Sequence, residues 1–321
     1  MIKNSDLLKV KDVKYLDDMR PSLIKNFTNG GARGEQIPFS KFGEGFSWMK
    51  RQVNIFAGIA NHGKTSFLMQ LAIIKSKNDG TKWGVFSPEQ NPPLYFYNDL
   101  IHAFIGKNTE PYYENQMSMV EYVRAMDFIN EHFFYIYPEN DAPTPEYINE
   151  RFLDLINRHN ITGCITDPFN QLSNDWNKSP GRDLYISEYL AKEKRFALAQ
   201  NVYKIIVVHP TKLQKQKEAL NYECPDVYDL AGGAMWTNAA DNILFVHRPY
   251  KSTDPKNTEV LVRVSKIKYQ KQVGIPGDFT FSFDPQTARY YEDGISPLDS
   301  DNPEKVPFEF TEEQKNDKLP F

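Results

Sequence analysis

Apolar segments of strand length alternate with helical patterns along most of this chain. Six of these segments are candidate strands that are mainly apolar: VNIFAG, WGVFSPE, FFYIY, GCITD, KIIVVH and NILFVHR. Helices fit between several of them. One is expected to begin at Thr144-Pro145, with Thr144 as its cap and Ile148 and Phe152 at helical spacing. Strands that are apolar on both faces need cover on both faces, so the pattern predicts an α/β domain with a mostly parallel central sheet.

After Glu259 the pattern changes to an alternation of apolar and polar residues. The stretches EVLVRVSKIKYQ and GDFTFSFDPQTARYYE both follow a period of two, and turn residues separate them. This alternation predicts an antiparallel hairpin at the C-terminal side of the domain.

An amphipathic helix is predicted before the domain, at residues 11–28, and Pro21 is expected to kink or restart it. Its apolar residues fall near one face: Val13, Leu16, Leu23, Ile24 and Phe27. The glycine-rich stretch NGGARGEQIP follows as a linker. The helix must bury its apolar face either on its own domain or on a neighbouring subunit, and the pattern leaves both alternatives open.

The charge of the chain is concentrated at its C-terminal end. Residues 297–321 hold seven acidic residues and three lysines, which equals the net charge of -4, so residues 1–296 sum to zero. A neutral body neither predicts nor excludes a local groove for nucleic acid. The acidic, proline-containing end is expected to be disordered. We therefore divide the chain into a linker helix and linker (1–35), the main domain (36–296) and an acidic tail (297–321).

Cysteine content and hydropathy favour an intracellular protein. Cys164 and Cys224 are too few for a disulfide framework, which favours a reducing compartment. The apolar runs are too short to span a bilayer, and the N-terminal residues lack the apolar region of a signal peptide. We therefore expect a cytoplasmic protein without a membrane partner.

The stretch GIANHGKTS has the spacing of a phosphate-binding loop. Gly58 is followed after four residues by Gly63-Lys64-Thr65, between a strand and a helix. The glycines let backbone N–H groups face the β-phosphate of ATP, and the helix start adds its positive dipole end. Lys64 is expected to reach the β- and γ-phosphates, and Thr65 to bind Mg²⁺. The predicted ATP-binding set also includes Asn61, His62 and Ser66.

Three further polar residues end predicted strands. Asp167 ends GCITD and is predicted as a second Mg²⁺ ligand, and Glu89 ends WGVFSPE and is predicted to polarise the attacking water. His209 ends KIIVVH and is expected beside the γ-phosphate. Because the carboxyl ends of parallel strands line one crevice, these side chains should converge on Lys64. The alternatives are that Asp167 only caps the strand end, that Glu89 is a solvated acid at a strand end, and that His209 is structural.

The order of these motifs resembles that of RecA-like ATPases. Within that group the chain is similar to the ring-forming replicative helicases of the DnaB and Twinkle type, including the helicase half of phage primase-helicases. The stretches that carry the resemblance are VVHPTK, DLAGGAMWTNAADNILFVHRP and VRVSKIKYQKQVGIPGDFTFSFDPQTARYY. The resemblance covers about residues 11–292 and implies a RecA-like P-loop NTPase core that ends in an antiparallel hairpin.

The resemblance also implies roles for residues outside the phosphate-binding loop. Arg248 and Phe281 match the positions that stack the nucleotide base in the family, although Phe281 also fits a core position. Lys266 and Lys268 match a Lys-x-Arg pair whose arginine reaches the ATP of the neighbouring subunit. The implied nucleic-acid contacts lie in or near the family's channel loop: Lys212, Lys215, Lys217, Ala231, Gly232 and Gly233.

Two motifs depart from the family pattern. Lys268 stands where the family has arginine, and lysine supplies a positive charge without a bidentate fork. Lys268 then acts more weakly, Arg248 assists it, or hydrolysis is slow. Ala231-Gly232 replaces an Arg-Glu pair in the channel loop, so DNA contacts there are expected to be made largely by the backbone.

Together these expectations predict an ATP- and Mg²⁺-dependent DNA helicase that forms a ring on single-stranded DNA during replication, and the resemblance implies a hexamer. The alternative is a RecA- or KaiC-like ATPase that uses ATP as an assembly switch on DNA or protein without unwinding. A small-molecule kinase would leave the paired lysines and the glycine loop unexplained. Primase and other replication proteins are candidate partners of the acidic tail, in a bacterium or a phage-infected cell.

Overall fold

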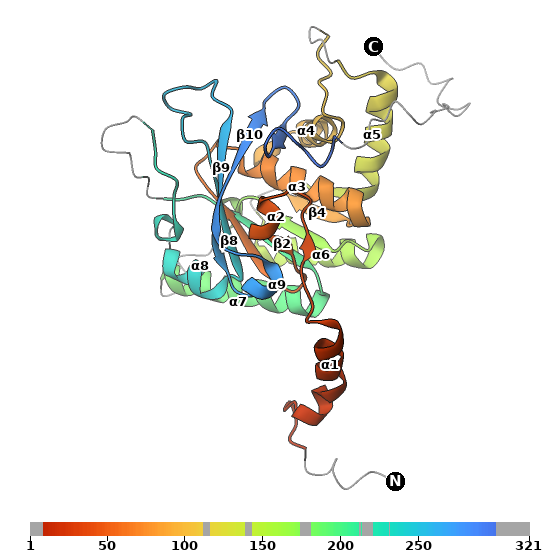
Figure 1. Cartoon of the computed structure of the whole chain (residues 1–321), viewed down its shortest axis with the longest axis vertical. Coiled ribbons are helices and arrows are strands. Elements are labelled where there is room, and N and C mark those ends of the chain that lie inside the picture. Colours follow the sequence, from red (N-terminus) through yellow and green to blue (C-terminus); the bar gives the residue numbers. More distant parts are fainter. Residues whose placement is uncertain are drawn as a thin grey trace, which may run out of the picture.

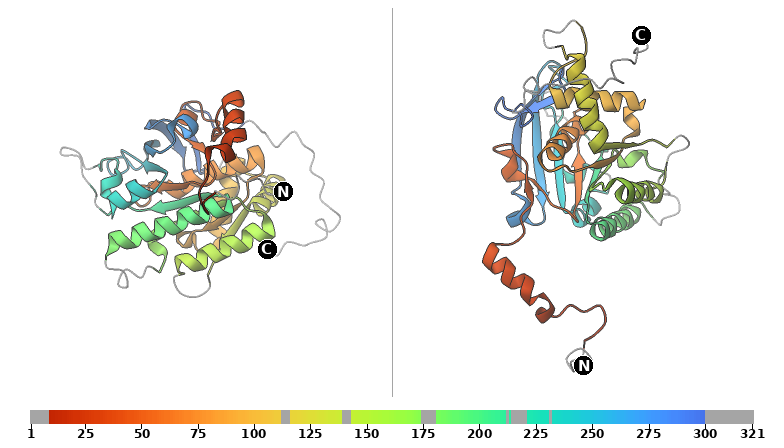
Figure 2. Two further views of the ribbon diagram at one scale, coloured as in Figure 1. Left: turned by 90° about the horizontal axis from the view of Figure 1, so that it is seen from below. Right: turned by 90° about the vertical axis from the view of Figure 1, so that its right-hand side faces the viewer.

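A nine-stranded sheet forms the centre of the computed structural model, which describes residues 9–111, 116–138, 143–173, 181–211, 213, 221–230 and 232–299. The strand order is β11-β10-β9-β8-β3-β7-β6-β4-β5, and helices cover both faces (Figures 1 and 2). The strands are β3 (Val53–Ala57), β4 (Trp83–Phe86), β5 (Phe133–Ile136), β6 (Gly163–Thr166), β7 (Tyr203–Val208), β8 (Asn242–His247), β9 (Glu259–Ile267), β10 (Gly277–Asp284) and β11 (Arg289–Tyr291).

The six strands from β8 to β5 are parallel to one another, as the apolar pattern predicts. The predicted antiparallel hairpin is β9 and β10. It extends the same sheet, because β9 pairs with β8, and the short strand β11 pairs with β10 at the edge. The predicted fold class, an α/β core with a mostly parallel central sheet and an antiparallel C-terminal hairpin, is confirmed.

Six helices pack against the sheet: α3 (Lys64–Asp79), α4 (Pro93–Ile105), α5 (Met119–His132), α6 (Pro145–His159), α7 (Arg182–Gln200) and α8 (Gly233–Ala239). The predicted cap of α6 is confirmed, since the Thr144 side chain accepts a hydrogen bond from the Tyr147 N–H at 3.2 Å. Alternate residues of β7 belong to two separate core clusters, with Ile205 in the cluster that includes α3 to α5 and Ile206 in the cluster that includes α6 to α8. This double burial explains why the strands carry apolar residues on both faces.

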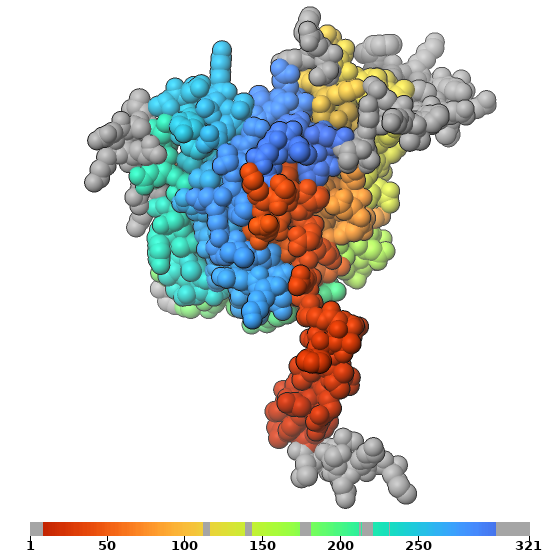
Figure 3. Space-filling model, in the orientation of Figure 1, coloured from red at the N-terminus to blue at the C-terminus, as the bar shows by residue number. Residues whose placement is uncertain are grey.

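Helix α1 (Leu16–Asn29) projects away from the body and buries none of its residues (Figures 1 and 3). Phe27 at its end is 92% exposed. The alternative that this helix packs on its own domain is therefore wrong. A restart at Pro21 is also wrong, because Pro21 lies inside one helix, whereas the expected kink stays a prediction.

The segment between α1 and β3 closes one side of the core. It contains β1 (Glu35–Gln36), α2 (Phe42–Gly45) and β2 (Ser47–Trp48), and β1 pairs with β2. The buried Glu292 carboxylate accepts hydrogen bonds from the N–H groups of Lys41 and Phe42, both at 2.8 Å, and so ties α2 to the end of β11. A further short helix, α9 (Gln270–Val273), connects β9 to β10. Among the described residues, no helix combines the length and apolar character that a membrane span requires.

The predicted tail starts later than expected. Leu298 is buried in the core, and Asp299 forms an ion pair with Arg289 at 2.7 Å. The sequence does not predict these contacts, because a single leucine barely changes the hydropathy of an acidic segment. Residues 300–321, to which the expectation of disorder mainly applies, lie outside the described part of the chain.

Candidate nucleotide-binding site

The phosphate-binding loop connects β3 to α3, as predicted. Gly58 has a φ of +150°, and a Cβ atom there would lie 2.2 Å from the carbonyl oxygen of Val246. Gly63 has a φ of +88°, and a Cβ atom there would lie 2.2 Å from the hydroxyl of Tyr290. Both positions therefore require glycine, and the chain enters α3 with its first N–H groups unpaired within the helix, where an anion is favoured.

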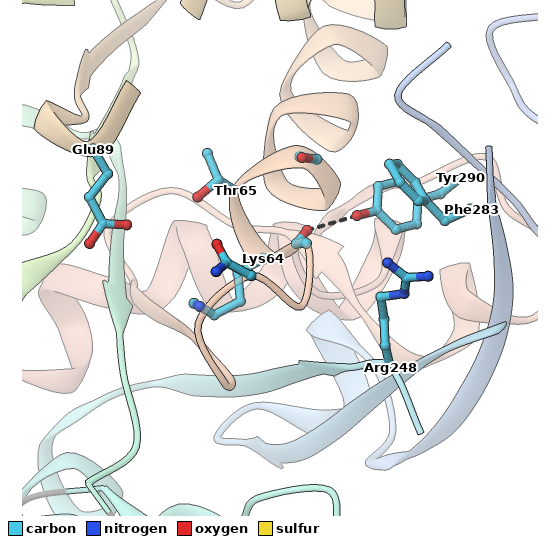
Figure 4. A pocket seen from close by; sticks show the side chains of 9 residues that line it. Lys64, Thr65, Glu89, Arg248, Phe283 and Tyr290 are labelled. Carbon is cyan, nitrogen blue, oxygen red and sulfur yellow. Dashed lines mark hydrogen bonds between the residues drawn. The ribbon is translucent and has the colours of Figure 1, made fainter. Parts of the chain in front are cut away.

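An open pocket of about 270 Å³ lies at this loop (Figure 4). Its lining residues come from the loop, from the segment after β4 and from the C-terminal strands: Asn61, Gly63, Lys64, Thr65, Ser66, Glu89, Arg248, Phe283 and Tyr290. The volume lies just below the range of about 300–1,000 Å³ that is typical of small-molecule sites. A single chain thus lines this pocket only partly and leaves it open to solvent.

Thr65 and Asp167 form a hydrogen-bonded pair of oxygen groups beside the loop. The Thr65 hydroxyl donates to the Asp167 carboxylate at 2.6 Å, and Asp167 is buried directly after β6. Burial raises the pKa of Asp167 to about 6, although the hydrogen bond from Thr65 and the charge of Lys64 act in the other direction. A hydroxyl and a carboxylate are ligands that Mg²⁺ accepts, so the donor set fits the predicted ion.

Lys64 lies close to both predicted acidic residues. Its Nζ donates to the carbonyl of Ile59 at 3.0 Å. Burial lowers the pKa of Lys64 to about 8, and the charges of Asp167 and Glu89 offset part of this effect. A phosphate group would stabilise the buried ammonium more than a single neutral carbonyl does.

Glu89 and His209 reach the same region from two other strands. Glu89 lies in the short 3-10 helix η2 (Pro88–Gln90) directly after β4, on the opposite side of the pocket from Arg248 (Figure 4). His209 follows β7, and burial together with the charge of Lys64 lowers its pKa, whereas Glu89 raises it. The expected convergence at the carboxyl ends of these strands is confirmed, and the catalytic roles stay predictions.

The residues expected to flank the nucleotide base differ from the prediction at one position. Arg248 lines the pocket as predicted, whereas Phe281 is only 2% exposed and packs against Phe67 in the aromatic core, with ring centroids 5.1 Å apart. Assigning Phe281 to the base is therefore wrong, and Phe283 lines the pocket instead. Side chains two residues apart share one face of a strand, so the alternation alone cannot tell which of them lies over the core and which lies at its edge.

The His62 side chain does not line the pocket, so only the backbone of this residue is placed to contact a nucleotide, and its membership of the ATP-binding set stays a prediction. Its ring stacks on His247 with centroids 5.1 Å apart, and its Nδ1 accepts a hydrogen bond from the Arg248 N–H at 3.0 Å. The residue before it, Asn61, has a φ of +62° and does line the pocket. The left-handed backbone at Asn61 thus directs the His62 ring toward β8, where it supports the loop.

Sequence reasoning does not identify three residues of this region. Tyr290 donates from its hydroxyl to the carbonyl of Gly63 at 2.8 Å (Figure 4), and Lys251 donates to the carbonyl of Asn61. Phe283 is the third. The period of two along β10 offers a weak signal for Phe283, but no motif marks Lys251 or Tyr290, which approach the loop only through the fold.

The paired lysines lie at the other end of the sheet from the phosphate-binding loop, because β9 ends beside the start of β8. Lys266 donates to the carbonyls of Thr237 and Ala240 at the end of α8, the latter at 2.7 Å. Lys268 is 3.5 Å from the buried carboxylate of Asp241. Neither lysine lies at the pocket of its own chain, so action on a neighbour's nucleotide stays a prediction.

The two glycines of the predicted channel loop have packing roles. Gly232 has a φ of +71° and lies before α8, and a Cβ atom at Gly233 would lie 2.1 Å from the carbonyl oxygen of Val227. These contacts explain both glycines without nucleic acid, and their role in DNA binding stays a prediction. The other predicted contacts lie outside the described residues: Lys212, Lys215, Lys217 and Ala231.

The fold is similar to that of known proteins, and two solved structures serve as examples. One is an ATPase domain, which superimposes with a TM-score of 0.67 and 17% identity, covering 88% of this chain and 99% of that chain. The other is a DnaB-like replicative helicase, solved in a study that includes its interactions with primase. It has a TM-score of 0.65 and 17% identity, covering 87% of this chain and 67% of that chain. At this identity the likeness concerns the fold alone.

Sequence comparisons identify the family to which this chain belongs. The Twinkle homolog protein, chloroplastic/mitochondrial, of Arabidopsis thaliana is 25% identical over 278 residues, which are 84% of this chain. The chain spans 38% of the length of that relative. The model of the DnaB-like helicase C-terminal domain matches residues 38–292, the region that contains the whole central sheet. This chain therefore belongs to the DnaB-like helicase C-terminal domain family.

Proposed function

We propose that this chain is the motor domain of an ATP-dependent DNA helicase that moves on single-stranded DNA and unwinds duplex DNA during replication. The observation that carries the proposal is the pocket lined by Lys64, Thr65 and Glu89, in which the Thr65 hydroxyl is hydrogen-bonded to the buried carboxylate of Asp167. These are the groups that phosphoryl transfer to water requires, and they occur in a chain of the DnaB-like helicase family.

In the proposed reaction, Lys64 binds the β- and γ-phosphates, and Glu89 takes a proton from the water that attacks the γ-phosphorus. The bond to the β-phosphate oxygen breaks, and ADP and phosphate leave. Thr65 and Asp167 would hold Mg²⁺, which neutralises phosphate charge when it is bound. His209 would report the state of the γ-phosphate to the segment that follows β7. Arg248 and Phe283 would flank the base.

The site is proposed to be completed by a second copy of the chain in a ring, with six subunits as in the family. The pocket is open, and Lys266 and Lys268 lie too far away to act within one chain. In the ring, these lysines would approach the neighbour's nucleotide, and α1 would cover its apolar residues on an adjacent body. Lys268 would first have to exchange its contact with Asp241 for the nucleotide.

DNA is proposed to pass through the ring near α8, where Gly232 and Gly233 begin the helix. Lys212, Lys215 and Lys217 would supply attraction that does not depend on sequence, and the Ala231-Gly232 backbone would approach the sugar-phosphate chain. Primase is a candidate partner of the acidic tail. The bacterial or phage-infected cytoplasm stays a prediction, since the Arabidopsis relative is named for chloroplasts and mitochondria.

The test of the site is Glu89→Gln. We expect the kcat of DNA-stimulated ATP hydrolysis to fall at least about 100-fold, because the water loses its base. Binding of a fluorescent ATP analogue should stay within about twofold, because the glutamate contacts the water and not the base or the α-phosphate. The control is Glu131→Gln, which removes an exposed carboxylate that pairs with Lys82 at 3.7 Å. Normal hydrolysis by Glu89→Gln would refute the role of Glu89.

The test of the motor is unwinding of forked DNA, combined with mass measurement by light scattering with and without ATP. A ring that unwinds the fork supports the proposal. An ATPase that assembles on DNA but leaves the fork intact would support the RecA- or KaiC-like switch instead, which the family match does not favour.

A further inference from the structure

The short turn that carries Glu89 is contacted by a tyrosine from the edge strand of the sheet. Residue Tyr135 of β5 pairs with Val85 of β4, and Ile136 pairs with Phe86, the last residue of β4. The Tyr135 side chain extends forward from this register, past the end of β4. Its hydroxyl therefore reaches the backbone of the turn that follows, residues 87–90.

The Tyr135 hydroxyl lies between the two carbonyl groups that flank Glu89. It is 2.6 Å from the carbonyl oxygen of Ser87 and 3.3 Å from that of Gln90. The N–H of Gln90 donates to the same Ser87 carbonyl at 3.0 Å and closes the turn. One phenol group thus contacts the backbone on both sides of the glutamate.

The Tyr135 ring is itself held in place. It packs against Phe96 of α4 with centroids 4.5 Å apart and stacks on Tyr137 at 6.2 Å. Its backbone N–H donates to the hydroxyl of Tyr97 at 3.4 Å. Burial raises the pKa of Tyr135 to about 12, so the phenol keeps its proton and stays a hydrogen-bond donor at neutral pH.

The position of the Glu89 carboxylate depends on this turn. Glu89 is exposed and forms no hydrogen bond or ion pair with any residue that the structure describes. The backbone of residues 87–90 is therefore what sets its distance from Lys64 and Thr65. A displacement of about 1 Å in a reacting group is enough to lower a rate by about 100-fold.

We propose that Tyr135 is a positioning residue for Glu89, because its hydroxyl holds both flanking carbonyls of the turn that carries this glutamate. The inference rests on the proposed function of the pocket in ATP hydrolysis. Tyr135 contacts the turn and not the pocket, so it acts on the chemical step through Glu89 and leaves nucleotide binding alone.

Tyr135→Phe tests the inference, because it removes one oxygen atom and keeps the ring against Phe96. We expect kcat for DNA-stimulated ATP hydrolysis to fall about tenfold, while KM for ATP stays within about twofold. The control is Tyr137→Phe, which removes a hydroxyl from the neighbouring exposed ring and should keep the kcat of the wild type. Thermal melting of both variants checks that each is folded.

A double variant separates positioning from a general structural effect. In the Glu89→Gln background, Tyr135→Phe should lower the residual kcat by less than about twofold, because the group that it positions is already absent. An independent tenfold loss in that background, or a wild-type kcat for Tyr135→Phe alone, would overturn the inference. A kcat close to that of the wild type in Glu89→Gln alone would instead refute the proposed role of Glu89 in hydrolysis, so the two failures are distinguishable.

Discussion

Two phenylalanines on the same face of β10 have different surroundings. Phe281 packs edge-on against Phe39, Phe42 and Phe67 in the core. Phe283 lies two residues further along, next to Tyr290, with ring centroids 4.7 Å apart at an angle of 38°. The strand therefore passes from the core to the edge of the pocket within two residues.

Alanine substitutions should separate these two positions. Phe283→Ala is expected to raise KM for ATP about tenfold at nearly unchanged kcat, because an aromatic contact with the base is lost. Phe281→Ala should lower the free energy of unfolding by about 3–5 kcal/mol, because it leaves a cavity in the core. Steady-state kinetics and urea unfolding measure the two effects. The reverse pattern would restore Phe281 as the residue that contacts the base.

A stacked pair of buried histidines supports the phosphate-binding loop. Burial lowers the pKa of His62 to about 3, helped by the nearby charges of His247, Lys251, Lys64 and Arg248. Burial likewise lowers the pKa of His247 to about 4. Both rings are therefore neutral in the folded protein at pH values where an unfolded chain, with an ordinary pKa near 6.5, already binds protons.

This difference predicts a loss of stability in mild acid. Below about pH 6.5 the unfolded chain binds more protons than the folded chain, so the free energy of unfolding falls by up to about 1.4 kcal/mol per pH unit for each ring. His62→Asn should reduce this slope in denaturant unfolding between about pH 6.5 and 4.5. The raised pKa of Asp167 changes the free energy of unfolding in the opposite direction as the pH falls. This contribution is the same in the wild type and in His62→Asn, so it cancels in their comparison. Identical slopes would contradict the prediction.

At the scale of elements, one carboxylate connects three parts of the fold. Asp241 lies fully buried before β8 and accepts a hydrogen bond from the Val53 N–H of β3 at 2.9 Å. It also pairs with Lys194 of α7, and with Lys268 after β9 at 3.5 Å. The Asp241 carboxylate thus contacts residues of β3, of α7 and of the segment that follows β9.

Asp241→Asn should lower the free energy of unfolding by about 2 kcal/mol. Breaking a fully buried ion pair costs about 3–5 kcal/mol, but here both lysines reach solvent. The expected loss is therefore closer to that of a hydrogen bond to a charged group. The control is Asp278→Asn, which breaks an exposed pair with Arg263 and should cost less than about 1 kcal/mol. Equal losses in urea unfolding would show that Asp241 has no special role.

At the scale of the whole molecule, α1 is the one described α-helix without a buried residue. Its apolar residues include Leu23 and Ile24, which are 50% and 59% exposed. A helix with this surface gains little stability from its own body, so its partner is expected to be another chain.

Removal of residues 1–30 should therefore separate folding from assembly. We expect the melting temperature of the shortened chain to stay close to that of the full chain, because α1 buries nothing on the body. Its mass by light scattering should shift toward smaller species, and its ATP hydrolysis should fall with it. A large drop in melting temperature would show that α1 packs on its own domain, and an unchanged mass would show that assembly does not use it.

Local patterns were sufficient for much of this protein. The parallel strands, the closing hairpin, the cap of α6 and the phosphate-binding loop all depend on residues within a few positions of one another. Strand ends also placed Asp167, Glu89 and His209 at one edge of the sheet, because the carboxyl ends of parallel strands meet there.

Long-range packing settled the rest. Tyr135 contacts a carbonyl 48 residues earlier in the chain, and Tyr290 contacts one 227 residues earlier. Such partners leave no periodic trace in the sequence, because each depends on how strands are ordered and how far each strand extends. The same holds for Phe283 in place of Phe281 and for the buried start of the acidic segment. These contacts form only when distant elements pack together, and two of the residues that make them, Phe283 and Tyr290, line one side of the pocket.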